Sequence, residues 1–403
     1  MQPSKFSINT AFLLYFYSFF FKVFGLFPWK ITLFSISHTK ATDPDNQAAK
    51  KSYYKHFYNI FLIVSFTSLH INFYIEVQKT TDETGTTTVV RRCLIFYGII
   101  TTLIILIYFV VRHKIISKAV NQLTKIDQVL NACNNYILVD NLGIHYLLFI
   151  NLLTCFSATM LQLATRPLIV FFTWSIPAVL CNWVLTQYSL VLHIIINRLK
   201  SINKFLLKLN RISIDLESKS ILFVKLPIIE SIDTEITNIK CAYIELYSVC
   251  LQIANFYTFP TLLAIIFLCS LSLYFCYFVI ITHYELVPFS MPERIMQIVW
   301  NIVVYYILII LSTYVNIFTN ECLYFQKKRT VDIIHWILNT HRLDKKTEKK
   351  LKEFSQHLLH ENIPFKVYDL MILDGSLLYA IISTAISYLI ILIQFRFYND
   401  EHT

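Results

Sequence analysis

The sequence predicts an all-α membrane protein that crosses the bilayer seven times. Of its 403 residues, 56% are hydrophobic and only 15% are charged, a balance that soluble globular proteins do not have. Several runs of about 20 residues carry almost no charge, and a helix of that length crosses the hydrocarbon core of a membrane. The lysines and arginines then gather in alternate connections between those runs.

The seven predicted spans are the longest apolar runs of the chain, and each is bounded by polar or charged connections. They lie at about residues 57–76, 93–111, 142–165, 167–196, 256–281, 298–320 and 372–395. An odd number of spans places the two termini on opposite sides of the membrane.

The distribution of basic residues predicts which side is which. Of the 35 lysines and arginines, 29 lie in the four segments on one side and 6 on the other. By the positive-inside rule the N-terminus is cytoplasmic and the C-terminus extracellular. This orientation is the reverse of that of a G-protein-coupled receptor. The net charge of +10 is explained by the basic residues of the cytoplasmic connections, so nucleic acid is not expected as a partner.

These spans divide the chain into seven regions with alternating surroundings. Residues 11–30 are interrupted by Lys22 and lack a small-residue cleavage site, so we expect an interfacial helix there and not a signal peptide. The expected regions are a cytoplasmic N-terminal segment (1–56), spans one to four (57–196), cytoplasmic anchor helices (197–255), spans five and six (256–320), a cytoplasmic anchor segment (321–371), the last span (372–395) and an extracellular tail (396–403).

The segment before the fifth span carries an unbroken helical seam. Its apolar residues recur at spacings of 3 and 4, which predicts a helix of heptad type continuous with that span. Two interpretations stay open: the seam builds an assembly platform below the membrane, or it packs within one subunit. The seam consists of Ile229, Ile232, Ile236, Ile239, Tyr243, Leu246, Cys250 and Ile253.

The last predicted span has one hydrophilic edge. Thr384, Ser387, Ile391 and Gln394 recur at spacings of 3, 4 and 3, so they share one side of a helix. Polar residues inside a membrane usually face a bundle interior or an aqueous cavity, and several copies of this edge around an axis would enclose a pore. The alternative is a hydrogen bond from Gln394 to a neighbouring helix.

The motif that closes this span, SYLIILIQF at Ser387 to Phe395, resembles the signature TYhhhhhQF of the insect gustatory receptor family, where h is apolar. The segment FKVFGLFPWK, Phe21 to Lys30, is similar to an aromatic GLxP segment that precedes the first span in that family. Seven spans with a cytoplasmic N-terminus also match, so the resemblance covers nearly the whole chain.

The resemblance implies a homotetrameric, nonselective cation channel of the plasma membrane. The channel would have a central pore and would be opened by a tastant. Gln394 and Phe395 would form the gate, Ile391 would narrow the path one turn earlier, and the cytoplasmic helices would form an anchor domain. Two positions depart from the family pattern, Ser387 in place of Thr and Leu389 where sugar receptors tend to carry Glu. We therefore expect a receptor outside the sugar subfamily, whose tastant is a bitter compound or another sugar.

Candidate ligand-binding residues lie toward the outer ends of the predicted spans. Aromatic faces and amides there suit a mostly apolar pocket with a few orienting polar groups, although the same residues also suit interfacial anchoring or interhelical hydrogen bonds. The candidates are Gln162, Arg166, Trp174, Tyr277, Gln297, Trp300, Asn301 and Tyr305.

Other functional classes find little support in the sequence. His357 and His360 share one face of an amphipathic segment, but no cluster of ligand spacing accompanies them, so no metal, cofactor or enzymatic activity is expected. A transporter usually shows internal repeats with Gly or Pro breaks, and the chain has 5 glycines. An olfactory-type subunit that needs a co-receptor shares the expected fold and remains the main alternative.

Overall fold

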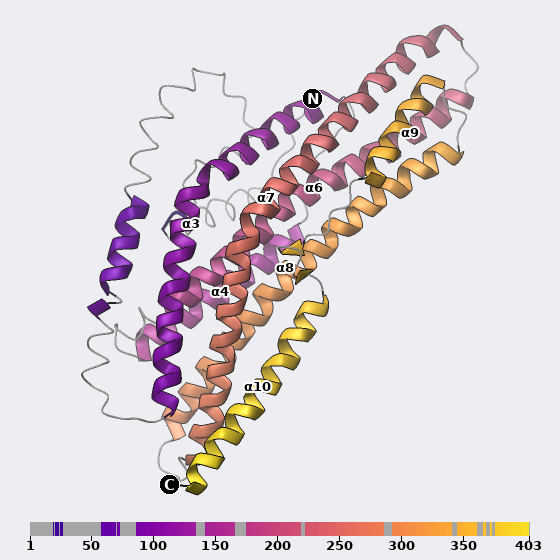
Figure 1. The fold of residues 1–403 in the computed structure, drawn as a ribbon. Coiled ribbons are helices and arrows are strands. Elements are labelled where there is room, and N and C mark those ends of the chain that lie inside the picture. Colours follow the sequence, from indigo (N-terminus) through magenta and orange to yellow (C-terminus); the bar gives the residue numbers. More distant parts are fainter. Residues whose placement is uncertain are drawn as a thin grey trace.

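The computed structural model of the chain is an elongated bundle of long helices (Figure 1). A short antiparallel hairpin, β1 (Lys366–Val367) and β2 (Met371–Ile372), precedes the last helix. The labelled helices are α3 (Thr86–Asn131), α4 (Leu142–Thr165), α6 (Ile176–Ser218), α7 (Leu222–Glu285), α8 (Pro292–Thr340), α9 (Lys345–His360) and α10 (Gly375–His402).

The structure describes most of the chain, and within some helices it describes the backbone but not every side chain. The described residues are 19, 21–23, 25–26, 58–69, 71–72, 86–133, 142–165, 175–218, 222–285, 292–340, 345–360, 366–367, 371–372 and 375–402.

The apolar helices of the structure overlap several of the predicted spans. Among the described residues, Val89–Asn131, Ile176–Lys208 and Thr234–Tyr277 are each long and apolar enough to cross a membrane. Three shorter apolar helices, Tyr58–Leu69, Leu148–Ser157 and Tyr379–Ile391, fall inside the first, third and seventh predicted spans. The sixth predicted span lies within α8, which begins with Pro292 in the position where a missing backbone N–H costs least.

Several helices are far longer than a membrane crossing requires. With 64 residues, α7 extends over about 96 Å, whereas a hydrocarbon core measures about 30 Å. Both α6 and α8 also continue well past their apolar stretches into sequence rich in Lys and Arg. The bundle therefore has an apolar end and a basic end, joined by continuous helices.

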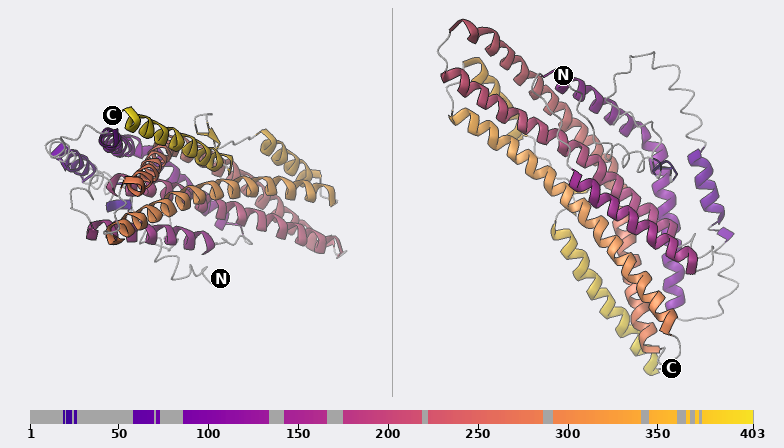
Figure 2. Two further views of the ribbon diagram at one scale, coloured as in Figure 1. Left: turned by 90° about the horizontal axis from the view of Figure 1, so that it is seen from below. Right: turned by 180° about the vertical axis from the view of Figure 1, so that it is seen from behind.

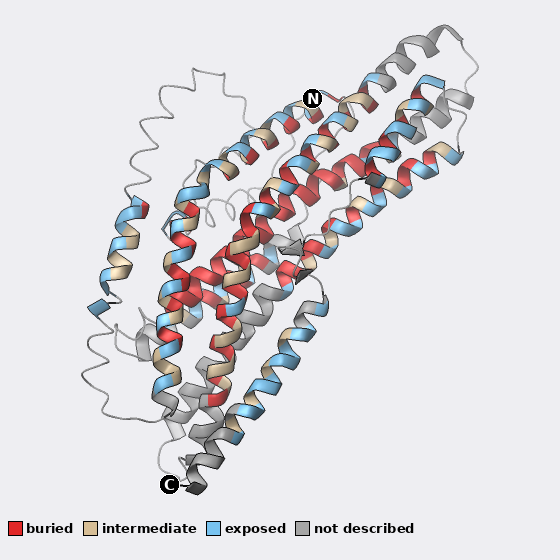
Figure 3. Ribbon diagram, viewed as in Figure 1, coloured by how far each residue is buried: buried red, intermediate tan, exposed pale blue. Residues whose placement is uncertain are grey.

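The centre of the bundle is α6, which packs against α3, α4, α7 and α8 (Figure 2). Nearly all of its described side chains are buried, polar ones included, and it appears as an almost continuous buried rod (Figure 3). Buried polar groups are stable only when they are hydrogen-bonded. The position of α6 therefore depends on polar partners supplied by its neighbours.

The clearest such partner is an ion pair between α6 and α3. The Arg198 guanidinium donates to both carboxylate oxygens of Asp127, at 2.8 Å and 2.5 Å, and also to the carbonyl of Ile194. The two side chains are only 5% and 12% exposed. This bidentate geometry fixes the rotation of α6 relative to α3.

The helical seam on α7 is buried within the protomer. Its described members, from Ile236 to Ile253, have almost no exposed surface, and α7 packs against α3 and α6 over this region. Of the two interpretations of the seam, packing within one subunit is therefore the one that the structure supports. The amphipathic helix α9 adds to this core by inserting Leu351, Phe354 and Leu358 against α7 and α8.

Part of the described N-terminal segment is packed into the bundle. Phe21 and Leu26 are fully buried, and the ring of Phe21 meets that of Trp183 edge-on at 5.3 Å. The segment is also held by hydrogen bonds, because Gln187 donates to the Leu26 carbonyl and Asn59 donates to the Gly25 carbonyl. Phe21 and Leu26 therefore contribute to the core beside α6, whereas Phe19, Lys22 and Val23 are exposed, so that one side of this short segment is buried.

We expect Asp127→Asn to destabilise the protein by about 3–5 kcal/mol, because it leaves the buried Arg198 charge without its counter-ion. The apparent melting temperature of the detergent-solubilised protein should fall by several degrees. The double variant Asp127→Leu/Arg198→Met should recover most of the loss, since it removes both charges. Equal melting temperatures for Asp127→Asn and the parent would show that the pair does not hold α3 to α6.

We expect Gly25→Ala to loosen the N-terminal segment. Gly25 has φ +72°, and an added Cβ would lie 3.0 Å from Oδ1 of Asn59 and 3.1 Å from Cδ1 of Leu62. Strain of this kind costs about 1–3 kcal/mol. Protease cleavage before Trp29 should become faster in Gly25→Ala but not in Ser68→Ala, an exposed control on the following helix.

Candidate functional site

The helix that carries the predicted pore stripe lies at the edge of the protomer. Among the described elements, α10 contacts α7 and α8, and most of its described surface is exposed (Figure 3). The hairpin β1–β2 stands between α9 and α10 in the chain. In the view from behind, α10 runs along one margin of the bundle, on the side away from α3 (Figure 2).

One face of α10 packs against its own protomer. Ile381, Ala385, Leu389 and Ile393 are each partly buried, and they recur every four residues on one side of the helix. Ile381 contacts the main hydrophobic core. The packing face therefore includes Leu389, the position that departs from the pattern of sugar receptors.

The predicted pore stripe points away from that packing face. Thr384, Ser387, Ile391 and Gln394 are all exposed, and at 3.6 residues per turn their mean direction is about 160° from that of the packing face. The structure thus brings these four residues together on one surface of α10. The side chain of Phe395 lies outside the described part of the chain.

The polar residues of the stripe differ in their need for a hydrogen-bond partner outside the helix. Ser387 donates its hydroxyl to the Ser383 carbonyl at 3.0 Å, and a hydroxyl paired with its own helix is inexpensive in any surroundings. Gln394 carries an amide with two donors and two acceptor positions, and it is exposed. An amide in hydrocarbon is costly, so Gln394 is the residue of the stripe that demands water or a polar partner.

A second exposed face of α10 is apolar. Tyr379, Ile382, Ile386 and Ile390 are each about half exposed or more, and they lie between the packing face and the pore stripe. Large apolar side chains at these positions suit contact with lipid or with another helix. The helix therefore presents three distinct surfaces: packing, polar and apolar.

Of the candidate ligand residues, the structure describes the side chain of Tyr277. Tyr277 on α7 is 2% exposed and belongs to the interior of the protomer. Gln297, Asn301 and Tyr305 lie on one side of α8 together with the neighbouring Trp300, and Gln162 lies near the end of α4, but their side chains are outside the described part. Arg166 and Trp174 fall outside the described residues.

A polar cluster between α4 and α6 was not singled out from the sequence. Asn151 donates to the Thr186 hydroxyl at 3.0 Å, and Thr186 donates to the Asn182 carbonyl at 2.8 Å. Among the described residues, the side-chain oxygens of Asn151 and Gln187 meet no hydrogen-bond donor. The sequence does show amide side chains in two adjacent predicted spans, which could have indicated a polar contact. Only the structure shows that these side chains lie close together.

The described part of the chain contains no group of three or more His, Cys, Asp or Glu residues arranged to hold a metal ion. The nine cysteines, all within the described residues, are free thiols. His357 on α9 is exposed, as expected for a solvated polar face.

Comparison with known proteins identifies a family and a solved structure that are similar to this chain. The family model described as 7tm Chemosensory receptor matches residues 14–399. The solved structure of the insect olfactory receptor OR5 from Machilis hrabei is similar with a TM-score of 0.63 at 12% sequence identity, and the match covers 96% of this chain and 99% of that one. A comparison with curated proteins finds no match. Because the family model spans nearly the entire sequence, the chain belongs to the 7tm chemosensory receptor family.

Proposed function

We propose that the protein is a subunit of a ligand-gated cation channel of the gustatory type, with α10 as the helix that lines the pore. The observation that carries this proposal is the placement of the Gln394 stripe on the face of α10 opposite its own protomer. A polar face turned outward from a membrane subunit needs a polar environment, and identical neighbours around an axis supply one.

The proposed assembly is a homotetramer in the plasma membrane, with the N-terminus cytoplasmic and the C-terminus extracellular. Seven spans in this orientation agree with the 29 to 6 asymmetry of basic residues. Four copies of α10 would then place their Gln394 amides around one water-filled path. The apolar face at Ile382, Ile386 and Ile390 would meet a neighbouring subunit or lipid.

The proposed gate consists of Gln394 and Phe395, with Ile391 one turn below. Apolar rings narrow a pore and gate it by dewetting, and amides beside them offer the first polar contact to an ion. A ligand in the outer half would open this gate only if it binds the open state more tightly than the closed state.

The proposed ligand is a small tastant, a bitter compound or a sugar, bound among the outer ends of the spans. The residues that we assign to this site are those expected from the sequence: Gln162, Arg166, Trp174, Tyr277, Gln297, Trp300, Asn301 and Tyr305. Tyr277 is buried beside the core and would take part through the shape of the pocket floor.

The olfactory-type subunit is the second candidate, and the similarity in fold to an insect olfactory receptor is the observation that favours it. The sequence motif SYLIILIQF favours the gustatory type. A subunit that conducts when expressed alone fits the gustatory proposal, whereas a requirement for a second receptor subunit fits the alternative.

The pore assignment predicts changed permeation in variants of Gln394. In cells that express the chain alone, Gln394→Glu should raise single-channel cation conductance and Gln394→Lys should lower it, each by roughly twofold or more, because ringed charges attract or repel permeating ions. Phe395→Ala should raise the open probability without ligand. Ile390→Ala, on the apolar face of the same helix, is the matched control and should leave conductance unchanged. Identical conductance in all these variants would remove α10 from the pore.

The ligand assignment predicts altered sensitivity without altered permeation. Asn301→Ala and Trp174→Ala should each shift the dose response to higher ligand by roughly fivefold to tenfold, as expected for the loss of about 1 kcal/mol of binding free energy. Single-channel conductance should stay the same. Asn339→Ala, an exposed position near the other end of α8, serves as the control. A dose response that matches the control would exclude these two residues from the site.

A further inference from the structure

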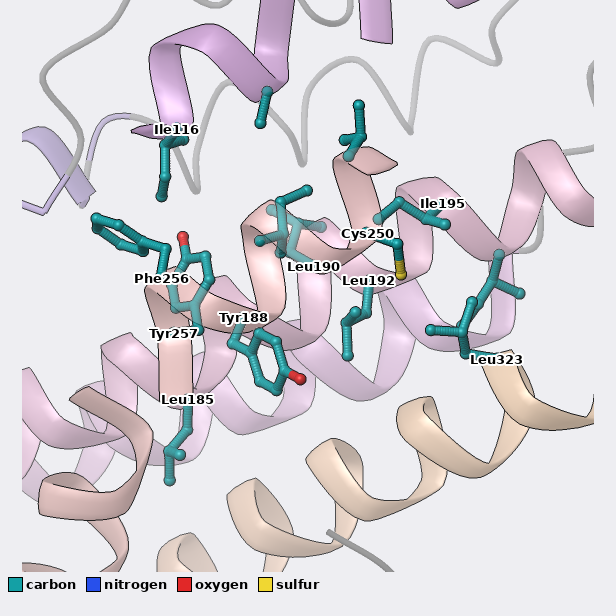
Figure 4. Close-up of a cluster of buried hydrophobic side chains, with 14 of the residues drawn as sticks. Ile116, Leu185, Tyr188, Leu190, Leu192, Ile195, Cys250, Phe256, Tyr257 and Leu323 are labelled. Carbon is teal, nitrogen blue, oxygen red and sulfur yellow. The ribbon is translucent and has the colours of Figure 1, made fainter. Parts of the chain in front are cut away.

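One side of α6 is polar along much of the fourth predicted span, although it is buried. Its polar residues follow one another at spacings of 4, 3, 4 and 4, so they share one face of the helix. Another side of α6 is apolar, and Figure 4 shows Tyr188 and Leu192 there in a cluster with Tyr257 of α7 and Leu323 of α8. The polar face of α6 consists of Asn182, Thr186, Ser189, His193 and Asn197, each more than nine-tenths buried.

Where α4 meets this polar face, the hydrogen bonds run in one direction. The Thr186 hydroxyl donates its proton to the Asn182 carbonyl at 2.8 Å, so toward Asn151 of α4 it can only accept. Asn151 donates to it at 3.0 Å through the amide nitrogen. The orientation of the Asn151 amide is thereby fixed, and its oxygen, Oδ1, needs a donor from elsewhere.

Several oxygen atoms of this interface find no hydrogen-bond partner in the part of the chain that the structure describes. They are Oδ1 of Asn151, Asn182 and Asn197, and Oγ of Ser189. Asn151 and Asn182 are 1% and 5% exposed, and each lies at least 9 residues inside its predicted span, so bulk water does not reach them. A buried amide oxygen without a donor costs more than the immobilisation of one water molecule.

The amide oxygens of Asn151 and Asn182 lie on successive turns of the interface. Asn151 contacts Thr186, and Cys155, one turn further along α4, lies beside the Asn182 amide. Because one turn of helix rises about 5.4 Å, the two oxygens are roughly 5 Å apart. A water molecule that donates hydrogen bonds of about 2.8 Å to both oxygens spans about that distance.

The chemistry of the interface favours water over a cation. Neither α4 nor the part of α6 within the fourth predicted span contains Asp or Glu. A buried ion would therefore have no counter-charge, and buried charges are stable only when they are paired. Water supplies the missing hydrogens without bringing a charge.

We propose that one or two water molecules are bound between α4 and α6, where they donate hydrogen bonds to Oδ1 of Asn151 and Oδ1 of Asn182. Hydrogen bonds to water re-form easily when two helices shift, whereas the bidentate pair of Arg198 with Asp127 holds α6 to α3 in one geometry. The hydrated contact is therefore the place where α4 can slide against α6 while α3 stays in register.

The test is X-ray radiolytic hydroxyl labelling of the full chain in lipid nanodiscs, read by mass spectrometry. Radicals form from water where it is irradiated, so a buried side chain is labelled quickly only when a bound water touches it. Cys155 is 3% exposed and borders the proposed site, whereas Cys181 is 0% exposed and lies on another side of α6. Cys155 should be labelled roughly fivefold faster than Cys181 or more. Equal rates for the two thiols would overturn the proposal.

Two variants locate the water within the interface. Asn182→Leu removes one acceptor at similar volume and should slow the labelling of Cys155 severalfold, with Cys181 unchanged. Thr154→Val is the matched control, because the Thr154 hydroxyl already donates to the Ile150 carbonyl of its own helix, and it should leave the labelling of Cys155 as in the parent. Parental labelling of Cys155 in Asn182→Leu would contradict the proposal. The comparison of the two thiols in the parent needs no variant, so it decides the matter even if Asn182→Leu fails to fold.

A change of buffer distinguishes water from a cation. Replacement of sodium by N-methylglucamine throughout purification should leave the labelling of Cys155 unchanged. Faster labelling without sodium would overturn the proposal, since it would mean that an alkali cation occupies the place of the water. None of these measurements involves Gln394 or a ligand, so failure here is distinct from failure of the pore assignment.

Discussion

The arrangement of this protein depends on α6, which is enclosed by other helices along nearly all of its described length. A helix in that position cannot turn its polar side chains to water, so they depend on partners inside the protein. Arg198 finds Asp127 on α3, Thr186 finds Asn151 on α4, Asn203 finds Gln326 on α8, and Gln187 finds the carbonyl of Leu26 in the N-terminal segment. Each contact joins a different element to α6. Because they are directional, together they set both the rotation and the height of α6 within a bundle that apolar packing alone would hold less specifically.

Periodicity in the sequence was sufficient to predict the elements themselves. Charge-free runs predicted long apolar helices, the spacing of 3 and 4 from Ile236 to Ile253 predicted a continuous helix, and the spacing from Thr384 to Gln394 predicted one shared face. These features follow from local geometry, because a helix places residues three and four apart on the same side. The direction of the Gln394 face relative to its own protomer was not predictable in this way. It depends on which residues of α10 contact α7 and α8, and those contacts are tertiary.

The features that the sequence did not reveal join residues that are distant along the chain. Arg198 and Asp127 are separated by 71 positions, and Gln187 and Leu26 by 161. The hydropathy of residues 11–30 is compatible with an interfacial helix, and nothing in the local pattern shows that Phe21 inserts beside Trp183. Tyr247 and Lys327 likewise come together from two helices, and neither residue is distinctive within its own segment.

The contrast between α6 and α10 has a consequence for biosynthesis. Whereas α6 acquires its partners from its own chain, α10 packs along one face only and leaves the Gln394 amide unaccompanied in a lone subunit. In the proposed assembly that amide reaches the water-filled pore only after the other subunits have associated. A newly made monomer would therefore hold its final helix less firmly than the rest, and the yield of finished receptor would rise more steeply than linearly with the amount of chain synthesised. At low expression, the number of assembled receptors would then limit the sensitivity of the cell before the affinity of each receptor for its ligand did.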